Sequence, residues 1–275
     1  MESKIKVLVV GCSMTKGHGL KRECSDPELW VNRLFPEEKY EVVNLAKTGH
    51  NNSWIFLETM SGLLTDTYDI VLVGWSAIPR FNFHVGLELY SVHTMLNEID
   101  VNINNKVVVS GKWLKTIGDS LREIHNDHWD FLDLVKYVNT LIQIQEKKNN
   151  GKIFFVNTLG PWPYQYFTKK QINQPIDLAL FEQELLQIDT RDDDEIFQLY
   201  NMIHKDYETY GGIQEAHWLN LYSSLRSMQV DNVSSTDPHP GYQSQSVFYH
   251  YLAPILRKKL KIMQPAEIDG NITSR

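Results

Sequence analysis

KIKVLVVGCSMTKGHG, the sequence of Lys4 to Gly19, joins an apolar run to a glycine-rich loop. The run is rich in β-branched residues and shows no alternation of polar and apolar positions, which is typical of a strand buried on both faces. It stops at Gly11 and places Cys12 and Ser13 at the carboxyl end of the strand. In open α/β sheets the reactive crevice lies beyond the carboxyl ends of the strands. Ser13 is therefore the first candidate for chemistry.

Composition narrows the class of protein and its partners. The chain has 275 residues with 42% hydrophobic content, enough for one large domain or two small ones. The net charge is −7, and the basic residues are scattered apart from a run at Arg257–Lys261. Binding to a phosphate backbone needs a concentrated basic face. Nucleic acid is therefore a poor candidate partner.

Cysteine usage and hydropathy indicate the compartment. Cys12 and Cys24 are too few for a disulfide framework and are expected to be free thiols in a reducing environment. The N-terminus lacks a basic segment followed by an apolar one, and no apolar run approaches the ~20 residues that span a bilayer. We expect a soluble, cytoplasmic protein that does not associate with membranes.

Strand-like and helix-like segments alternate along most of the chain. After the first strand, further strands are predicted at Tyr40–Ala46, Asp69–Val73, Lys152–Val156 and, more weakly, Trp218–Tyr222. Helices are predicted at about Glu28–Phe35, Ser53–Leu64, Gly86–Glu98, Asp127–Lys148 and Tyr242–Lys261. For the first of these, Asp26 is the expected cap and Pro27 the first residue. This alternation favours a parallel sheet with helices on both faces.

Two segments depart from the alternation. Residues 165–216 mix aromatic and acidic residues and are interpreted as a helical insertion within a single domain spanning 1–262. The acidic run Asp189–Glu195 is interpreted as a solvated helix start rather than a metal site, because carboxylates favour helix N-termini. Residues 263–275 are expected to form a flexible tail.

The strand ends carry the residue types of a serine hydrolase. Nucleophilic catalysis by serine needs a histidine base, a group that orients the histidine, and donors for the oxyanion. Ser13 follows the first strand, Gly49 follows the second, and Gly74–Ser76 follows the third. Asp237 and His239 precede the last predicted helix. These positions predict one site at the carboxyl edge of the sheet.

The same positions resemble the four sequence blocks of the SGNH (GDSL-type) hydrolases, in the family's order and over most of the chain. Gly11-Cys12-Ser13 stands at the first block, and Gly49 at the second. Gly74-Trp75-Ser76 stands at the third, and Asp237-Pro238-His239 at the last. The resemblance implies a flavodoxin-like α/β/α sandwich with a five-stranded parallel sheet. It also implies hydrolysis of an ester, commonly an acyl or O-acetyl group, without a cofactor or metal.

The resemblance also assigns roles to individual residues. Ser13 is the implied nucleophile, His239 its base, and Asp237 the group that holds the imidazole. The N–H groups of Ser13 and Gly49 are the implied oxyanion donors, and Ser76 stands at the position of the third donor.

Three departures from the family pattern bear on activity. Cys12 replaces the aspartate beside the nucleophile, and Asp237 and His239 have one residue between them rather than two. Ser76 replaces an asparagine whose side chain donates to the oxyanion. Loss of one such donor costs about 10²–10³ in turnover, unless the Ser76 hydroxyl or Asn52 substitutes.

Several further residues are candidates for substrate binding. Arg80 follows the third block, where its guanidinium fork suits a carboxylate or a phosphate, or a structural ion pair. Trp75 and Trp162 stand at strand ends and are suited to a sugar-binding wall, although aromatic residues are also ordinary core residues. An O-acylated carbohydrate is the substrate class that this pattern favours.

Other chemistries fit the sequence less well. The spacing of Gly11 and Gly17 and the position of Lys16 match neither a phosphate loop nor a dinucleotide-binding pattern. His125 and His128 lack a third metal ligand of suitable spacing, and Cys12 is expected to be a small core residue rather than the nucleophile. A hypothesis from another class remains: a catalytically weak SGNH-like module that binds a glycan or a protein.

Overall fold

The computed structural model describes residues 3–77, 127–159, 215–220 and 224–262, together with the backbone of short segments between 80 and 116. Within these residues, four parallel strands form one sheet in the order β2-β1-β3-β8. Their bounds are Ile5–Gly11 for β1, Tyr40–Asn44 for β2, Ile70–Trp75 for β3 and Lys152–Asn157 for β8. The strand predicted from the first apolar run, and the three that follow it, are confirmed.

The register of the sheet brings the carboxyl ends of its inner strands together. Gly11 of β1 pairs with Gly74 of β3, and Gly74 pairs with Val156 of β8. The apolar residues of these three strands are buried almost without exception, because helices cover both faces of the sheet. Strand β2 lies at one edge and is only half-buried.

The described sheet contains four strands and not the five that were predicted. At the expected fifth strand, Trp218 makes a single parallel bridge to Phe155, and the Leu219 N–H donates to the Phe155 carbonyl at 2.9 Å. The side chain of Asn220 then takes the place of a further rung. It accepts from the Asn157 N–H at 2.7 Å and donates to the Asn157 carbonyl at 2.8 Å. A side-chain amide therefore occupies the position of the next rung at the end of β8.

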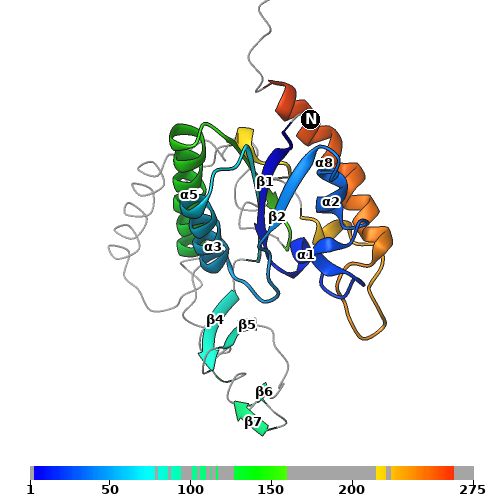
Figure 1. Ribbon diagram of the computed structural model, residues 1–275. Helices are drawn as coiled ribbons and strands as arrows, with labels where there is room; N and C mark the ends of the chain where they lie inside the picture. The colour runs from blue at the N-terminus through cyan, green and yellow to red at the C-terminus, as the bar shows by residue number, and fades with distance from the viewer. Residues whose placement is uncertain are drawn as a thin grey trace, which may run out of the picture.

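Helices lie on the two faces of the sheet and make a three-layer α/β/α arrangement (Figure 1). On one side α3 (Asn52–Thr65) contacts α5 (Asp127–Ile142), which continues into a π-helical turn at Gln143–Lys148. On the other side α2 (Trp30–Leu34) packs against α8 (Tyr242–Ile262). The short helix α1 (Ser13–Lys16) follows β1 directly.

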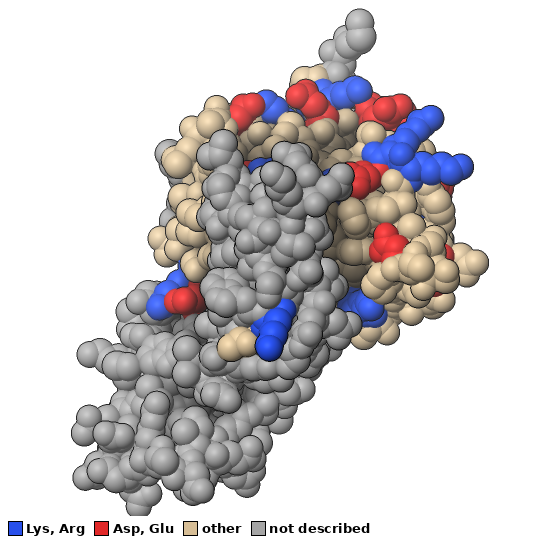
Figure 2. All heavy atoms as spheres, turned by 90° about the horizontal axis from the view of Figure 1, so that it is seen from below, with Lys and Arg blue, Asp and Glu red and all other residues tan. Residues whose placement is uncertain are grey.

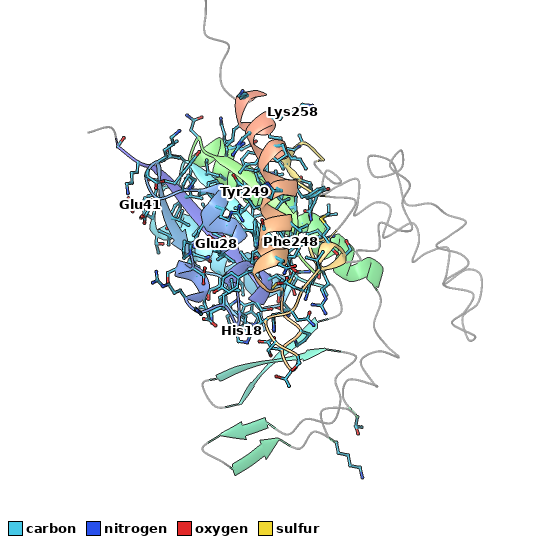
Figure 3. All side chains as sticks on the ribbon, turned by 90° about the vertical axis from the view of Figure 1, so that its right-hand side faces the viewer. His18, Glu28, Glu41, Phe248, Tyr249 and Lys258 are labelled. Carbon is cyan, nitrogen blue, oxygen red and sulfur yellow. The ribbon has the colours of Figure 1, made fainter. Side chains whose placement is uncertain are left out.

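Helix α8 closes one face of the core with its apolar stripe. Phe248 and Leu252 are fully buried, as the helical spacing predicts. Tyr249 lies beside them, and the guanidinium of Arg33 stacks over its ring at 4.4 Å. Figure 3 shows Phe248 and Tyr249 on this helix, with His18 at the lower end of the described core.

Two predicted helices differ from the structure. Helix α2 begins at Trp30 rather than Glu28, and Asp26 instead accepts the Glu28 N–H at 3.0 Å in a turn that precedes the helix. The helix predicted at Gly86–Glu98 is wrong. Strand β4 (Arg80–Val85) pairs antiparallel with β5 (Glu88–His93) there. The alternation of apolar and polar residues in RFNFHV is the period of a strand.

A second hairpin pairs β6 (Val101–Ile103) with β7 (Lys106–Val109). Neither hairpin is hydrogen-bonded to the four-stranded sheet. The predicted insertion at 165–216 lies almost entirely outside the described residues, and the predicted tail at 263–275 lies wholly outside them.

Charged residues of both signs intermingle on the face seen in Figure 2. Ion pairs among the described residues join Lys6 to Asp66, Lys16 to Glu23 at 2.7 Å, and Lys47 to Glu58 at 2.5 Å. Among the described helices, we find none with the length and apolar content that a bilayer crossing requires.

Thr15 of α1 packs against the two glycines at the strand ends. Its side chain is fully buried, and its hydroxyl has no hydrogen-bond partner among the described residues. A Cβ at Gly74 would lie 2.2 Å from Thr15 Oγ1 and 3.1 Å from a methyl of Thr158. The absence of a side chain at Gly74 therefore lets α1 approach the sheet.

We expect Gly74→Ala to lower the free energy of unfolding by about 1–3 kcal/mol, the usual cost of overpacking a core. Thr15→Ala removes the hydroxyl that the new methyl group would meet. The double variant should therefore lose less stability than the sum of the two single variants. Urea denaturation of the four proteins measures this coupling, and strictly additive losses would contradict the assigned contact.

Candidate active site

Ser13 is placed by the abrupt change from strand to helix after β1. Cys12 is extended, Ser13 is the first residue of α1, and the left-handed Gly17 (φ 72°) ends the helix by donating its N–H to the Ser13 carbonyl. Glycine suits this conformation because a side chain would be strained there. Ser13 is only 3% exposed. The sequence thus holds the candidate nucleophile at the carboxyl edge of the sheet, on a one-turn helix.

Cys12 belongs to the core, as predicted. Its side chain is fully buried, and its sulfur lies 3.3 Å from the Thr158 hydroxyl. That hydroxyl donates to the Trp75 carbonyl at 2.6 Å, so it accepts from the cysteine. The chain of contacts ties together the ends of β1, β3 and β8. Both Cys12 and Cys24 are free thiols.

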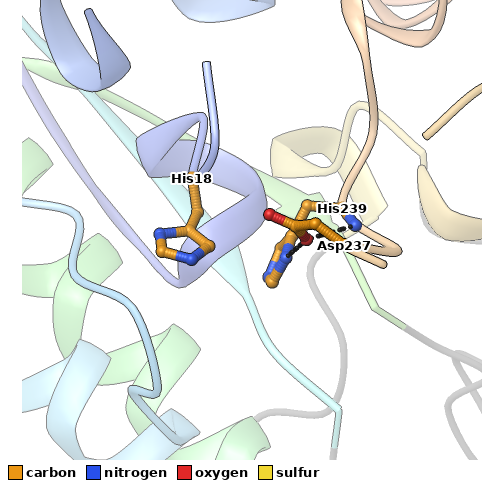
Figure 4. A group of neighbouring side chains, drawn as sticks. All are labelled: His18, Asp237 and His239. Atoms are coloured by element: carbon orange, nitrogen blue, oxygen red, sulfur yellow. Dashed lines mark hydrogen bonds and ion pairs between the residues drawn. The ribbon is translucent and has the colours of Figure 1, made fainter. Parts of the chain in front are cut away.

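Asp237 and His239 form a hydrogen-bonded pair in the loop before α8 (Figure 4). The Asp237 carboxylate lies 2.6 Å from Nδ1 of His239 and also accepts the His239 backbone N–H at 3.0 Å. The backbone N–H and then the ring of His239 hold the pKa of Asp237 below its ordinary value. The carboxylate is therefore charged at neutral pH. The single residue between the two is enough for Asp237 to orient the imidazole.

Contacts from two directions hold this loop in place. Arg226 and Gln229 both donate to the Pro238 carbonyl, at 2.7 and 2.9 Å. The Val233 N–H donates to the His239 carbonyl at 2.8 Å. The backbone that carries the pair is thus fixed on both sides of His239.

His18 joins the pair, and the sequence patterns did not single it out. Its ring lies edge-on to the His239 ring, with the centroids 4.6 Å apart and the planes at 71°. Its backbone N–H donates to the Ser13 carbonyl at 3.0 Å. His18 thus connects the loop of the candidate nucleophile to the candidate base. The only sequence signal was a histidine between two glycines, five residues after Ser13.

The candidate nucleophile and base are brought to the same edge of the sheet. Among the hydrogen bonds of the described residues, none joins the Ser13 hydroxyl to the His239 ring. Catalytic hydrogen bonds are often long in unliganded enzymes and shorten when substrate binds. The arrangement supplies an oriented imidazole and a serine on adjoining loops, which is the residue set for acyl transfer.

The candidate oxyanion residues stand on the loops after β2 and β3. Gly49 has φ of 85°, a left-handed conformation that suits glycine. Ser76 is fully buried, and its backbone N–H donates to Asn52 Oδ1 at 2.8 Å. The Asn52 amide also donates to the Ser76 carbonyl at 3.3 Å. Asn52 therefore binds the Ser76 backbone in both directions, which fixes the loop after β3 against the start of α3.

We expect Asn52→Ala to lower the free energy of unfolding by about 1–3 kcal/mol, because the Ser76 N–H loses its acceptor in a buried position. Asn52→Asp keeps an acceptor oxygen and is the matched control. It should retain more of the stability in urea denaturation. An equal loss in both variants would mean that the acceptor is not what stabilises this loop.

Trp75 packs in the core. It is fully buried, and its ring stacks on Phe155 and Tyr137 with centroids 6.0 and 6.4 Å apart. The pleat of β3 directs it toward α5, a position that does not favour the predicted sugar-binding role. The Arg80 side chain and the whole of Trp162 lie outside the described residues.

Comparisons with known proteins give structural matches only. No family model matches the sequence, and no curated protein matches it. A psychrotrophic esterase, EstA from Pseudoalteromonas, matches with a TM-score of 0.45 and 11% identity, over 93% of this chain and 98% of that one. A lipolytic protein of the G-D-S-L family from Veillonella parvula matches with a TM-score of 0.42 and 9% identity, over 92% and 99%.

A third match is a carbohydrate esterase family 2 enzyme from Corynascus thermopiles, with a TM-score of 0.43 and 13% identity over 94% of this chain and 67% of that one. These matched structures are esterases and a lipolytic protein. Their TM-scores lie below 0.5, so the likeness establishes neither the fold nor the activity of this chain. The assignment of the candidate site therefore depends on the contacts observed within this chain.

Proposed function

We propose that the protein is a serine esterase of the SGNH type. The observation that carries the proposal is the Asp237–His239 contact of 2.6 Å, made across a single intervening residue. A charged carboxylate bound to Nδ1 fixes the imidazole in the tautomer whose Nε2 can accept a proton. Ser13 lies on the adjoining strand-end loop, linked to this pair through His18.

The proposed reaction has two halves. Ser13 Oγ attacks the ester carbonyl carbon while His239 takes the hydroxyl proton, and Asp237 stabilises the imidazolium that forms. The N–H groups of Ser13 and Gly49 donate to the oxyanion, with the Ser76 hydroxyl as third donor. The tetrahedral species collapses, and the alcohol leaves with the proton from His239. Water, deprotonated by His239, then attacks the acyl-serine and releases the carboxylic acid.

The surroundings of Ser13 favour a short acyl group. Ser13 is 3% exposed, and the next two residues along the chain, Met14 and Thr15, are also buried. An acetyl group needs little room beyond the reacting carbon, whereas a long acyl chain needs an apolar channel beside the serine. We propose an O-acetyl ester as substrate, with a carbohydrate as the alcohol half.

Two assays test the proposal. The first measures hydrolysis of p-nitrophenyl acetate and, separately, release of acetate from O-acetylated sugars. The second labels the protein with a fluorophosphonate and maps the adduct by mass spectrometry. We expect turnover of the acetate ester and a single adduct on Ser13. A protein that neither turns over these esters nor takes the label would instead support a glycan- or protein-binding module.

A further inference from the structure

We propose that His18, Asp237 and His239 form a binding site for a divalent zinc ion. These three side chains each offer one ligand atom, and the three atoms lie within 4.8 Å of one another. They come from two segments far apart in the sequence, and Figure 4 shows them on facing loops. Zinc binding requires only this geometry, whereas the effect of zinc on turnover rests on the proposed esterase function.

The donor set suits zinc. Two imidazole nitrogens and one carboxylate oxygen form a ligand set found at zinc sites that keep an open fourth position for water. Imidazole ligands favour zinc and its transition-metal neighbours, whereas calcium and magnesium prefer sites made only of oxygen. The set therefore selects against the hard cations that are most abundant in cells.

Contacts at its other ring nitrogen orient His18 for this role. Its Nδ1 lies 3.2 Å from the Thr48 hydroxyl and 3.3 Å from a carboxylate oxygen of Glu23. Metal-binding histidines usually donate their other ring N–H to a carboxylate or similar acceptor, which fixes the tautomer. The Lys16 ammonium lies 2.7 Å from the other carboxylate oxygen of Glu23. These contacts leave Nε2 of His18 as the nitrogen available to a metal.

The three side chains are partly exposed, so an ion can enter and the ligand atoms can move closer together around it. Exposed fractions are 36% for the His18 side chain, 28% for Asp237 and 27% for His239. Bonds of about 2.0–2.1 Å to a tetrahedral zinc separate the ligand atoms by about 3.3 Å. His18 is the most exposed of the three and has the most room to move toward the other two.

Zinc at this site would switch off the proposed reaction. A lone pair of His239 that is bound to the metal cannot accept the Ser13 proton. The Asp237 carboxylate would also be shared with the ion instead of stabilising an imidazolium. The expected result is reversible inhibition by zinc that a chelator relieves.

Titration calorimetry with zinc chloride on the full chain tests binding without reference to turnover. Wild type, Ser13→Ala and His250→Ala should bind zinc with the same affinity, since His250 is an exposed histidine on α8 that does not belong to the cluster. Loss of a group that hydrogen-bonds to a metal ligand weakens metal binding roughly 10- to 100-fold. His18→Asn removes a ligand itself and should weaken zinc binding by at least that factor. Glu23→Gln keeps all three ligands and should weaken binding about 10-fold.

The outcomes separate the two proposals. Failure of wild type to bind zinc, or equal affinity in wild type and His18→Asn, overturns the zinc site. Binding that depends on His18, in a protein without esterase turnover, leaves the zinc site standing and removes the esterase. If the enzyme is active, zinc inhibition is measured for each variant relative to that variant's own rate without metal. The zinc concentration needed for inhibition should rise in His18→Asn by the same factor as the dissociation constant for zinc. Inhibition that is unchanged in this variant contradicts the proposed switch.

Discussion

Replacing Ser13 by alanine is expected to reduce hydrolysis of p-nitrophenyl acetate by roughly 10⁴- to 10⁶-fold, the range seen when a catalytic serine is removed. The variant loses the atom that attacks the ester, and no other described side chain occupies its place on α1. Ser13 packs in a buried loop, but alanine is smaller and needs no hydrogen-bond partner. The variant should therefore fold, and its initial rates under saturating substrate give the comparison with wild type.

Ser25→Ala is the matched control for this measurement. Ser25 is an exposed serine at the end of the short 3₁₀ helix Glu23–Ser25, and its hydroxyl donates to the Arg22 carbonyl at 2.9 Å. We expect wild-type turnover and full fluorophosphonate labelling in this variant. Retention of turnover in Ser13→Ala, or an adduct that maps elsewhere, would exclude Ser13 as the nucleophile.

The second large effect is expected for His239→Ala, which removes the proton acceptor and should cost about as much turnover as Ser13→Ala. Residues that act as one unit are not additive, so the double variant should be no slower than either single variant. Initial rates of the three proteins measure this. His250→Ala removes an exposed histidine from the same part of the chain and should leave the rate unchanged. A double variant slower by the product of the single effects would mean that the two residues act independently.

The sheet and its candidate site follow from the sequence to a large extent. Strands β1, β3 and β8 were predictable because strands buried on both faces need continuous β-branched and aromatic runs. Helix α8 was predictable from its apolar spacing, and the burial of Cys12 from its place next to Ser13. The positions of Ser13, Asp237 and His239 at strand or helix ends were also readable, because loops at that edge meet in space.

What the sequence did not predict depends on contacts between distant segments. Trp75 could face either a crevice or the core, and only its packing with Tyr137 of α5 decides between them. His18 carries no periodic signal, and its contact with His239 spans most of the chain. Whether one residue between Asp237 and His239 permits a hydrogen bond depends on the loop that Arg226 and Gln229 hold. The catalytic roles themselves stay predictions that the two variants above will test.

The Asn220 amide has a consequence for the free energy of ending a strand inside the protein. Asn157 is fully buried, so its backbone groups cannot turn to water. Both the donor and the acceptor of that backbone are bound by the Asn220 side chain, at 2.7 and 2.8 Å. A buried backbone group left without a partner would cost about 1–3 kcal/mol. A single amide side chain in this way lets β8 end in the core without that penalty.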